Sequence, residues 1–123
     1  MASKKAKPLD EAILHLRQAL EASRAKPQDA LSFLAVSKAF EVAVEYGWRE
    51  LKRRVEDEGL EAPSPKEAVR KAARLNFIKD PEAWLSSIEG RNASVHDYFG
   101  IGEKELFELA ETFLSLAEKI QKR

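Results

Sequence analysis

Three side chains that can bind or process a phosphate lie within one short segment of the sequence: Arg91, His96 and Tyr98. A guanidinium group can hold a phosphate through two parallel hydrogen bonds, and an imidazole can transfer protons near neutral pH. A tyrosine hydroxyl can donate or accept a hydrogen bond, or be modified. Together these residue types favour a phosphate or nucleotide ligand.

The spacing of these residues does not place all three on one helical face. Arg91 and Tyr98 would point within about 20° of one another, whereas His96 would point about 140° away from Arg91. A single helix can therefore present all three only if it bends, ends early or meets a second copy of the chain. This geometry favours a groove or a dimer seam.

Two interpretations of this segment remain open on chemistry alone. RNA cleavage without a metal needs a base, a proton donor and a cation near the developing phosphorane charge, and His96, Tyr98 and Arg91 are chemically suited to these roles. In the packing alternative, Arg91 pairs with Glu89 or Asp97, while His96 caps the helix and Tyr98 packs at its edge. The packing alternative is favoured by the residues alone, because short motifs often arise by chance.

The elements that must position these residues are helices. Apolar residues recur at three- and four-residue spacing, and alternating β-branched segments are missing, which predicts an all-α protein. The expected helices run from about Leu9 to Pro27, from about Asp29 to Gly59, from Pro65 to about Leu75, from Pro81 toward Gly100, and through Leu106 to Ile120. They predict an antiparallel up-and-down bundle of four to five helices, the third one short.

Local signals mark some of these helices. Ser64, Pro65 and Glu67 form a capping box with proline at the first helical position, and Asp80 and Pro81 repeat that start. Gly47 lies inside the second helix. It is either a weak point, since glycine costs about 1 kcal/mol relative to alanine, or a place where another helix approaches closely.

The length and composition indicate one domain. We expect residues 1–8 to form a disordered tail and residues 9–122 a single helical-bundle domain. The 21 basic and 21 acidic residues balance, so the net charge gives no argument for nucleic-acid or membrane binding. No apolar run is long enough to span a bilayer, and no signal peptide is apparent, so we expect a cytoplasmic protein.

The composition also restricts the chemistry. The absence of cysteine excludes disulfides, thiolate metal sites and cysteine nucleophiles. No pair of histidines or dense carboxylate cluster has the spacing of metal ligands, so neither a metal nor another cofactor is expected. His15 has no companion ligand nearby in sequence and is interpreted as structural.

Glutamates of the second helix are further candidates. Glu41 and Glu45 lie one turn apart and can form a carboxylate pair facing a cleft. The favoured alternative is that Glu45 pairs with Arg49 and Glu41 with Lys38, because mid-helix glutamates are mostly solvated. For Trp48 and Trp84, which are aromatic residues at helical spacing, we predict positions in the core or in a dimer interface.

The order of Arg91, Asn92, His96 and Tyr98 resembles the signature of the HEPN superfamily of small helical nucleotide-binding proteins. More narrowly, the chain resembles the nucleotidyltransferase substrate-binding branch of that superfamily. The likeness extends from about Leu31 to Tyr98 and includes Phe40-Glu41, Glu45, Trp48, Leu51, Lys52, Ser64-Pro65-Lys66 and Trp84-Leu85. One departure is Phe99-Gly100 after the tyrosine, where relatives often carry a polar or acidic residue.

The resemblance implies a homodimer that works with a separate minimal nucleotidyltransferase. It places Arg91, Asn92, His96, Tyr98 and Glu45 in a nucleotide- or phosphate-binding cleft at the dimer seam. The resulting hypothesis is a substrate-binding subunit that presents a nucleotide or RNA to the transferase.

Some relatives imply a different activity. In these the HEPN protein is a metal-independent RNase toxin, and the partner silences it by transferring a nucleotide to the tyrosine of the motif. Arg91 and His96 would then be catalytic, and Tyr98 the modified residue. A third possibility is a dimeric scaffold without a ligand.

Overall fold

The computed structural model describes residues 7–27, 29–96 and 102–122, with only the backbone described for residues 94–96. Five helices make up the fold: α1 (Lys7–Ala25), α2 (Ala30–Asp57), α3 (Pro65–Arg74), α4 (Pro81–His96) and α5 (Glu103–Gln121). No strand occurs in these ranges, so the predicted all-α bundle is confirmed. None of the helices in this part of the chain has the length and apolar character that a membrane span requires.

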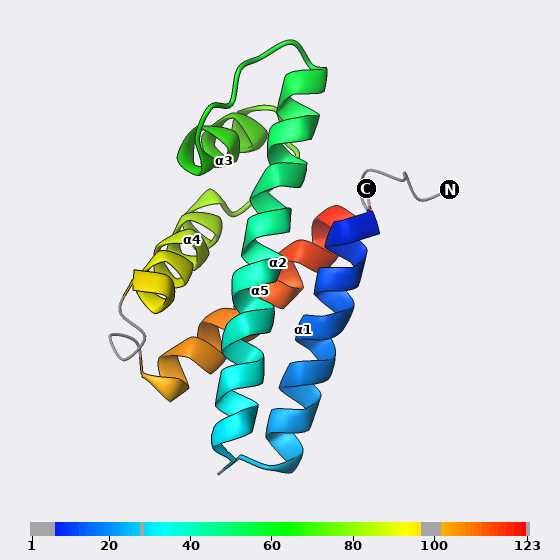
Figure 1. Ribbon diagram of the computed structural model, residues 1–123. Coiled ribbons are helices and arrows are strands. Elements are labelled where there is room, and N and C mark those ends of the chain that lie inside the picture. Colours follow the sequence, from blue (N-terminus) through cyan, green and yellow to red (C-terminus); the bar gives the residue numbers. More distant parts are fainter. Residues whose placement is uncertain (1–6, 28, 97–101, 123) are drawn as a thin grey trace.

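The longest helix, α2, is the element around which the others are arranged. It contacts α1, α3, α4 and α5. In Figure 1, α1 lies beside the N-terminal half of α2, and α3 lies at the C-terminal end of α2. α4 lies on the side of α2 that is away from α1, and α5 crosses behind α2. Different side chains of α2 therefore contact each of the other four helices.

The predicted helix starts are present. The Ser64 hydroxyl accepts a hydrogen bond from the backbone N–H of Glu67 at 3.2 Å. Asp80 accepts one from the N–H of Ala83 at 3.1 Å. These caps fix where α3 and α4 begin, because they satisfy N–H groups that have no partner within the helix.

The start of α1 differs from the prediction. Lys7 and Pro8, which were expected in a disordered tail, form the first turn of the helix. Proline is compatible with this position because the first backbone N–H groups of a helix need no intrahelical acceptor.

Side chains from α1 and α5 pair in antiparallel order. Gln121 donates to Asp10 at 2.9 Å, and Arg17 lies 2.7 Å from Glu118. A third pair, Arg24 with Glu111 at 2.8 Å, lies at the other end of the two helices. Exposed ion pairs contribute only about 0–1 kcal/mol each, so they mark the alignment of the helices more than they stabilise it.

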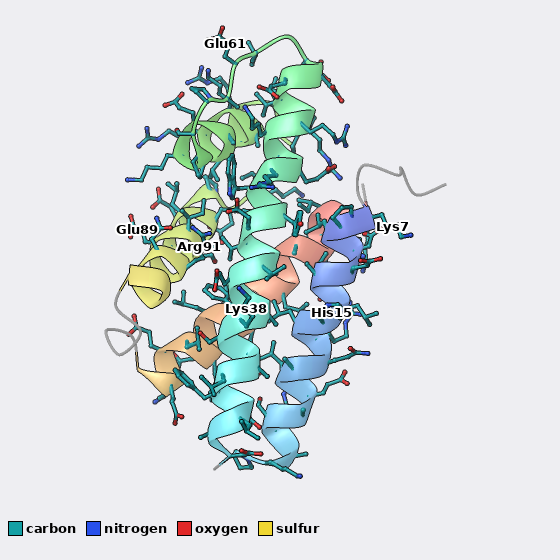
Figure 2. The ribbon with its side chains drawn as sticks, viewed as in Figure 1. Lys7, His15, Lys38, Glu61, Glu89 and Arg91 are labelled. Atoms are coloured by element: carbon teal, nitrogen blue, oxygen red, sulfur yellow. The ribbon has the colours of Figure 1, made fainter. Side chains whose placement is uncertain are left out.

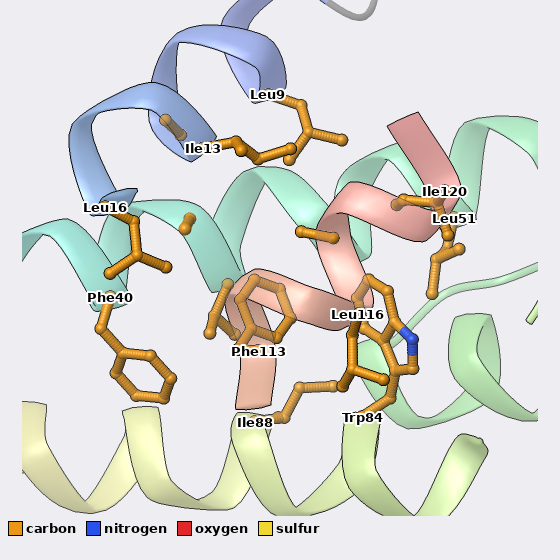
Figure 3. Close-up of a cluster of buried hydrophobic side chains, with 14 of the residues drawn as sticks. Leu9, Ile13, Leu16, Phe40, Leu51, Trp84, Ile88, Phe113, Leu116 and Ile120 are labelled. Atoms are coloured by element: carbon orange, nitrogen blue, oxygen red, sulfur yellow. The ribbon is translucent and has the colours of Figure 1, made fainter. Parts of the chain in front are cut away.

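The core is centred on aromatic rings from three helices. Phe40, Trp84 and Phe113 are each at most 1 % exposed. The ring of Phe113 meets that of Trp84 edge to face, with centroids 5.1 Å apart, and that of Phe40 with centroids 6.2 Å apart. Figure 3 shows these rings among aliphatic side chains of α1, α2, α4 and α5. Trp84 is thus a core residue, as predicted.

Gly47 allows this packing. A Cβ atom at this position would lie 2.8 Å from Cζ of Phe113 and 3.2 Å from Cζ3 of Trp84. The glycine therefore lets both rings approach the backbone of α2, which supports the second of its two sequence interpretations.

A buried ionic cluster on α2 was not predicted. The Glu50 carboxylate, 4 % exposed, accepts hydrogen bonds from Arg53 at 2.6 and 3.0 Å and from Arg54 at 2.7 Å. Arg54 also donates to the carbonyl of Ile120 at 2.9 Å, near the C-terminus of α5. Burial alone would raise the pKa of Glu50, but the hydrogen bonds and charges of the two arginines outweigh it and lower the pKa below 4.5.

Replacing Gly47 by alanine is expected to destabilise the fold. Alanine improves helix propensity by about 1 kcal/mol, but overpacking against two buried rings costs about 1–3 kcal/mol. We expect a net loss of about 1 kcal/mol in the free energy of unfolding, measured by urea denaturation. Gly90→Ala is the matched control, because its Cβ would meet the end of the flexible Leu109 side chain, which can rotate away. Equal stability changes in the two variants would contradict this account.

Glu50→Gln is expected to destabilise the protein by roughly 2 kcal/mol at pH 7, because charge-assisted hydrogen bonds to two arginines are lost. The pKa of Glu50 is lower in the folded state than its ordinary value of 4.5. The stabilisation is therefore complete above pH 4.5 and disappears as the pH falls through the folded-state pKa. Denaturation at several pH values should show the deficit shrinking in acid. Glu58→Gln, at the exposed end of α2, should show little deficit at any pH, and a pH-independent deficit for Glu50→Gln would argue against the prediction.

Candidate functional site

Two of the predicted site residues, Glu45 on α2 and Arg91 on α4, lie in direct contact. Nη2 of Arg91 is 3.3 Å from Oε2 of Glu45, and both side chains are about one quarter exposed. Figure 2 shows Arg91 on α4, on the side that faces α2. The packing alternative paired this arginine with Glu89 or Asp97, its neighbours in sequence. The ion pair with Glu45 comes from another helix, and the pair with Asp97 stays a prediction because Asp97 lies outside the described residues.

Glu45 has further donors on its own helix. Nη2 of Arg49 lies 2.7 Å from Oε1 of Glu45, and the indole N–H of Trp48 donates to Oε2 at 3.0 Å. The predicted pair of Glu45 with Arg49 is confirmed, and so is the pair of Glu41 with Lys38, at 3.6 Å. Since both oxygens of Glu45 are engaged, its carboxylate is held in one orientation and can position the guanidinium of Arg91.

An open pocket of about 260 Å³ lies over this contact and is lined by Glu41, Val42, Glu45, Tyr46, Arg49 and Arg91. Its charges balance, with two carboxylates and two guanidinium groups. The guanidinium carbon of Arg49 lies 5.8 Å from the centroid of the Tyr46 ring, within the range of a cation–π contact. The pocket therefore offers cations, hydrogen-bond acceptors and an aromatic ring within one small volume.

Asn92 stands beside the pocket. Its side-chain oxygen accepts a hydrogen bond from Nη1 of Arg91 at 3.2 Å, and the residue is exposed. It is not among the lining residues of the pocket. Asn92 therefore contacts the arginine without lining the pocket.

The remaining predicted site residues fall outside the described part of the chain. His96 is the last residue of α4, but its side chain is not described. Tyr98 lies wholly outside the described residues. The roles assigned to both therefore stay predictions.

A second groove adjoins the pocket and shares Val42 with it. It runs between α1 and α2, has a volume of about 390 Å³, and carries His15, Gln18 and Lys38 among small side chains. His15, which was interpreted as structural, is exposed on α1, and Figure 2 shows it on the same face of the molecule as Lys38.

Tyr46 and Val42 line the pocket and were missed by the sequence analysis. The signal was available, because Val42, Tyr46 and Arg49 follow one another at four- and three-residue spacing on the helix that carries Glu45. Within the described ranges, no group of three or more histidines and carboxylates is arranged to hold a metal ion.

No curated protein matches the chain. A family model described as "Nucleotidyltransferase substrate binding protein like" matches residues 4–123, almost the entire sequence, and so extends well beyond the segments that carried the resemblance. The chain therefore belongs to this family of nucleotidyltransferase substrate-binding-like proteins.

Proposed function

We propose that this protein is the substrate-binding subunit of a separate minimal nucleotidyltransferase, and that it binds a nucleotide or an RNA phosphate in a cleft containing Arg91. The family description supplies the partner. The observation that carries the proposal is the contact between Glu45 and Arg91 at the base of an open pocket. In this arrangement the transferase performs the chemistry, and the present chain presents the substrate in the cytoplasm.

The chemistry of the pocket suits the parts of a nucleotide. Arg91 and Arg49 supply N–H donors for phosphate oxygens, and guanidinium groups match phosphate geometry well. Glu41 can accept hydrogen bonds from ribose hydroxyls. The ring of Tyr46 is a flat surface on which a base can stack. The balanced charge of the free pocket would become negative when a phosphate enters, so Glu45 both orients Arg91 and limits how strongly the site holds an anion.

The proposal includes a homodimer that completes the cleft. The pocket is open, and its volume of about 260 Å³ is slightly below the range of about 300–1,000 Å³ typical of small-molecule sites. Leu31 and Leu34 are 70 % and 46 % exposed on α2, and their helical positions lie within about 40° of the direction of Glu45. An apolar surface on the same side of α2 as the pocket is a suitable contact for a second protomer, which would also bring a second copy of the histidine and tyrosine of the motif to the seam.

The partner is tested by searching the neighbouring genes for a small nucleotidyltransferase and co-expressing it with this chain. We expect the two proteins to co-purify and the transferase to act on a substrate bound by this chain. A gene without such a neighbour, or a neighbour that fails to co-purify, would contradict the proposal.

Arg91→Ala is expected to weaken ATP binding by about 10- to 100-fold in calorimetry, because the loss of a charge-assisted hydrogen bond is worth roughly 1.5–3 kcal/mol. Arg70→Ala is the matched control. It removes the same charge from α3, where Arg70 is exposed and lies near Glu67. Equal losses in the two variants would show a general charge effect and contradict a site at Arg91.

The RNase alternative is tested with the same proteins. Incubation with structured RNA in the presence of a chelator should leave the RNA intact if the chain is a binding subunit. Cleavage by the wild type, but not by Arg91→Ala or His96→Ala, would overturn the leading proposal and support a metal-independent RNase whose partner modifies Tyr98.

Leu34→Asp is expected to convert the dimer into a monomer, because it places a charge in the proposed apolar contact. Light scattering at micromolar concentration measures the mass directly. Leu60→Asp is the control, since Leu60 is also exposed but lies beyond the C-terminal end of α2. A monomeric wild type, or dimers in both variants, would rule out this interface.

A further inference from the structure

A further cavity, of about 340 Å³, lies near the N-terminal end of α4. Its apolar lining consists of Phe77, Ile78, Trp84, Leu116 and Ile120. These residues come from the α3–α4 connection, α4 and the C-terminal half of α5. Figure 3 shows Trp84, Leu116 and Ile120 converging where α4 meets α5. The cavity shares no lining residue with the pocket at Arg91.

Trp84 brings an unused hydrogen-bond donor to this cavity. The residue is 1 % exposed, yet no described residue accepts a hydrogen bond from its indole N–H. The other tryptophan, Trp48, donates its N–H to Glu45. Figure 3 shows the indole nitrogen of Trp84 on the side of the ring turned away from Phe113. This N–H is therefore available to an acceptor on a bound molecule.

The charged residues of the cavity favour an anion. Lys79, Lys119 and Lys122 line it and are exposed, and no carboxylate of the described residues lies within ion-pair distance of them. Asp80 is the acidic lining residue, and its carboxylate already accepts the hydrogen bond that caps α4. The cavity thus combines an apolar interior, one indole N–H without an acceptor among the described residues, and three lysines against one aspartate.

We propose that this cavity binds a small organic anion whose apolar body fills the space between Trp84, Leu116 and Ile120. The anionic group lies among the three lysines, and one of its oxygens accepts the hydrogen bond of the Trp84 indole. This site is additional to the nucleotide-binding cleft of the proposed function. The two sites are joined by α4, on which Trp84 and Arg91 lie about 10 Å apart along the helix axis.

Binding is measured with decanoate in the Trp48→Phe variant, in which Trp84 is the remaining tryptophan. We expect a saturable change in Trp84 fluorescence on titration with decanoate. Decanol, which has the same chain without the charge, should bind at least tenfold more weakly, a difference of roughly 1.4 kcal/mol. No saturation, or equal affinity for the two compounds, would overturn the proposal.

The lysines are tested in the same background with the double substitution Lys79→Gln and Lys119→Gln. It should weaken decanoate binding about tenfold and leave decanol binding unchanged. Lys104→Gln is the matched control for the second position, because Lys104 is exposed on α5 at its opposite end. A loss of decanoate binding in Lys104→Gln as large as in the double variant would overturn the assignment of the lysines.

The donor is tested by Trp84→Phe, which keeps an aromatic ring but removes the N–H. Calorimetry should show weaker decanoate binding, and circular dichroism serves to establish that the variant is folded. If Trp84→Phe does not fold, the lysine variants and the decanol comparison still decide the proposal. A folded variant with unchanged decanoate affinity would exclude the hydrogen bond.

Discussion

The rings of Phe113 and Trp84 pack directly against the backbone of α2 at Gly47. They leave no space there for a side chain. This contact sets the distance between α2 and α4. Arg91 follows Trp84 by seven residues, so it points in nearly the same direction from α4. The packing that seats Trp84 against α2 therefore also directs Arg91 toward Glu45. The position of the candidate site therefore depends on the close packing of the core at Gly47.

Contacts between glutamate and arginine occur at two places on α2. Glu45 meets arginines at the edge of an open pocket, whereas Glu50 meets them in the interior. The two glutamates are five residues apart, so they point about 140° away from one another around the helix. Glu50 connects α2 to the C-terminus of α5 through Arg54. The inner cluster fixes the helix in place, and the outer cluster presents its charges to solvent at the open pocket.

Local features of this fold were predictable from the sequence, and contacts between distant helices were not. The cap at Ser64 and the pair of Glu45 with Arg49 depend on residues three and four positions apart, whose geometry within a helix is fixed. The contact of Glu45 with Arg91 depends on which faces of two helices meet, and helical spacing contains no such information. Glu50 was missed for the same reason, because a mid-helix glutamate is usually solvated unless a neighbouring helix covers it. Glu45 was singled out by family resemblance, and the structure supplied the physical reason for its position.

The antiparallel alignment of α1 with α5 has a consequence for how the protein is made. Because α1 precedes α5 in the chain and packs against it, the apolar side of α1, including Leu9, Ile13 and Leu16, stays incompletely covered until α5 has been made. Contacts between such distant parts of a chain carry a large loop-closure entropy and form late. During translation, α2 is the surface available to shield α1, which gives the hairpin of these two helices the role of an early folding unit.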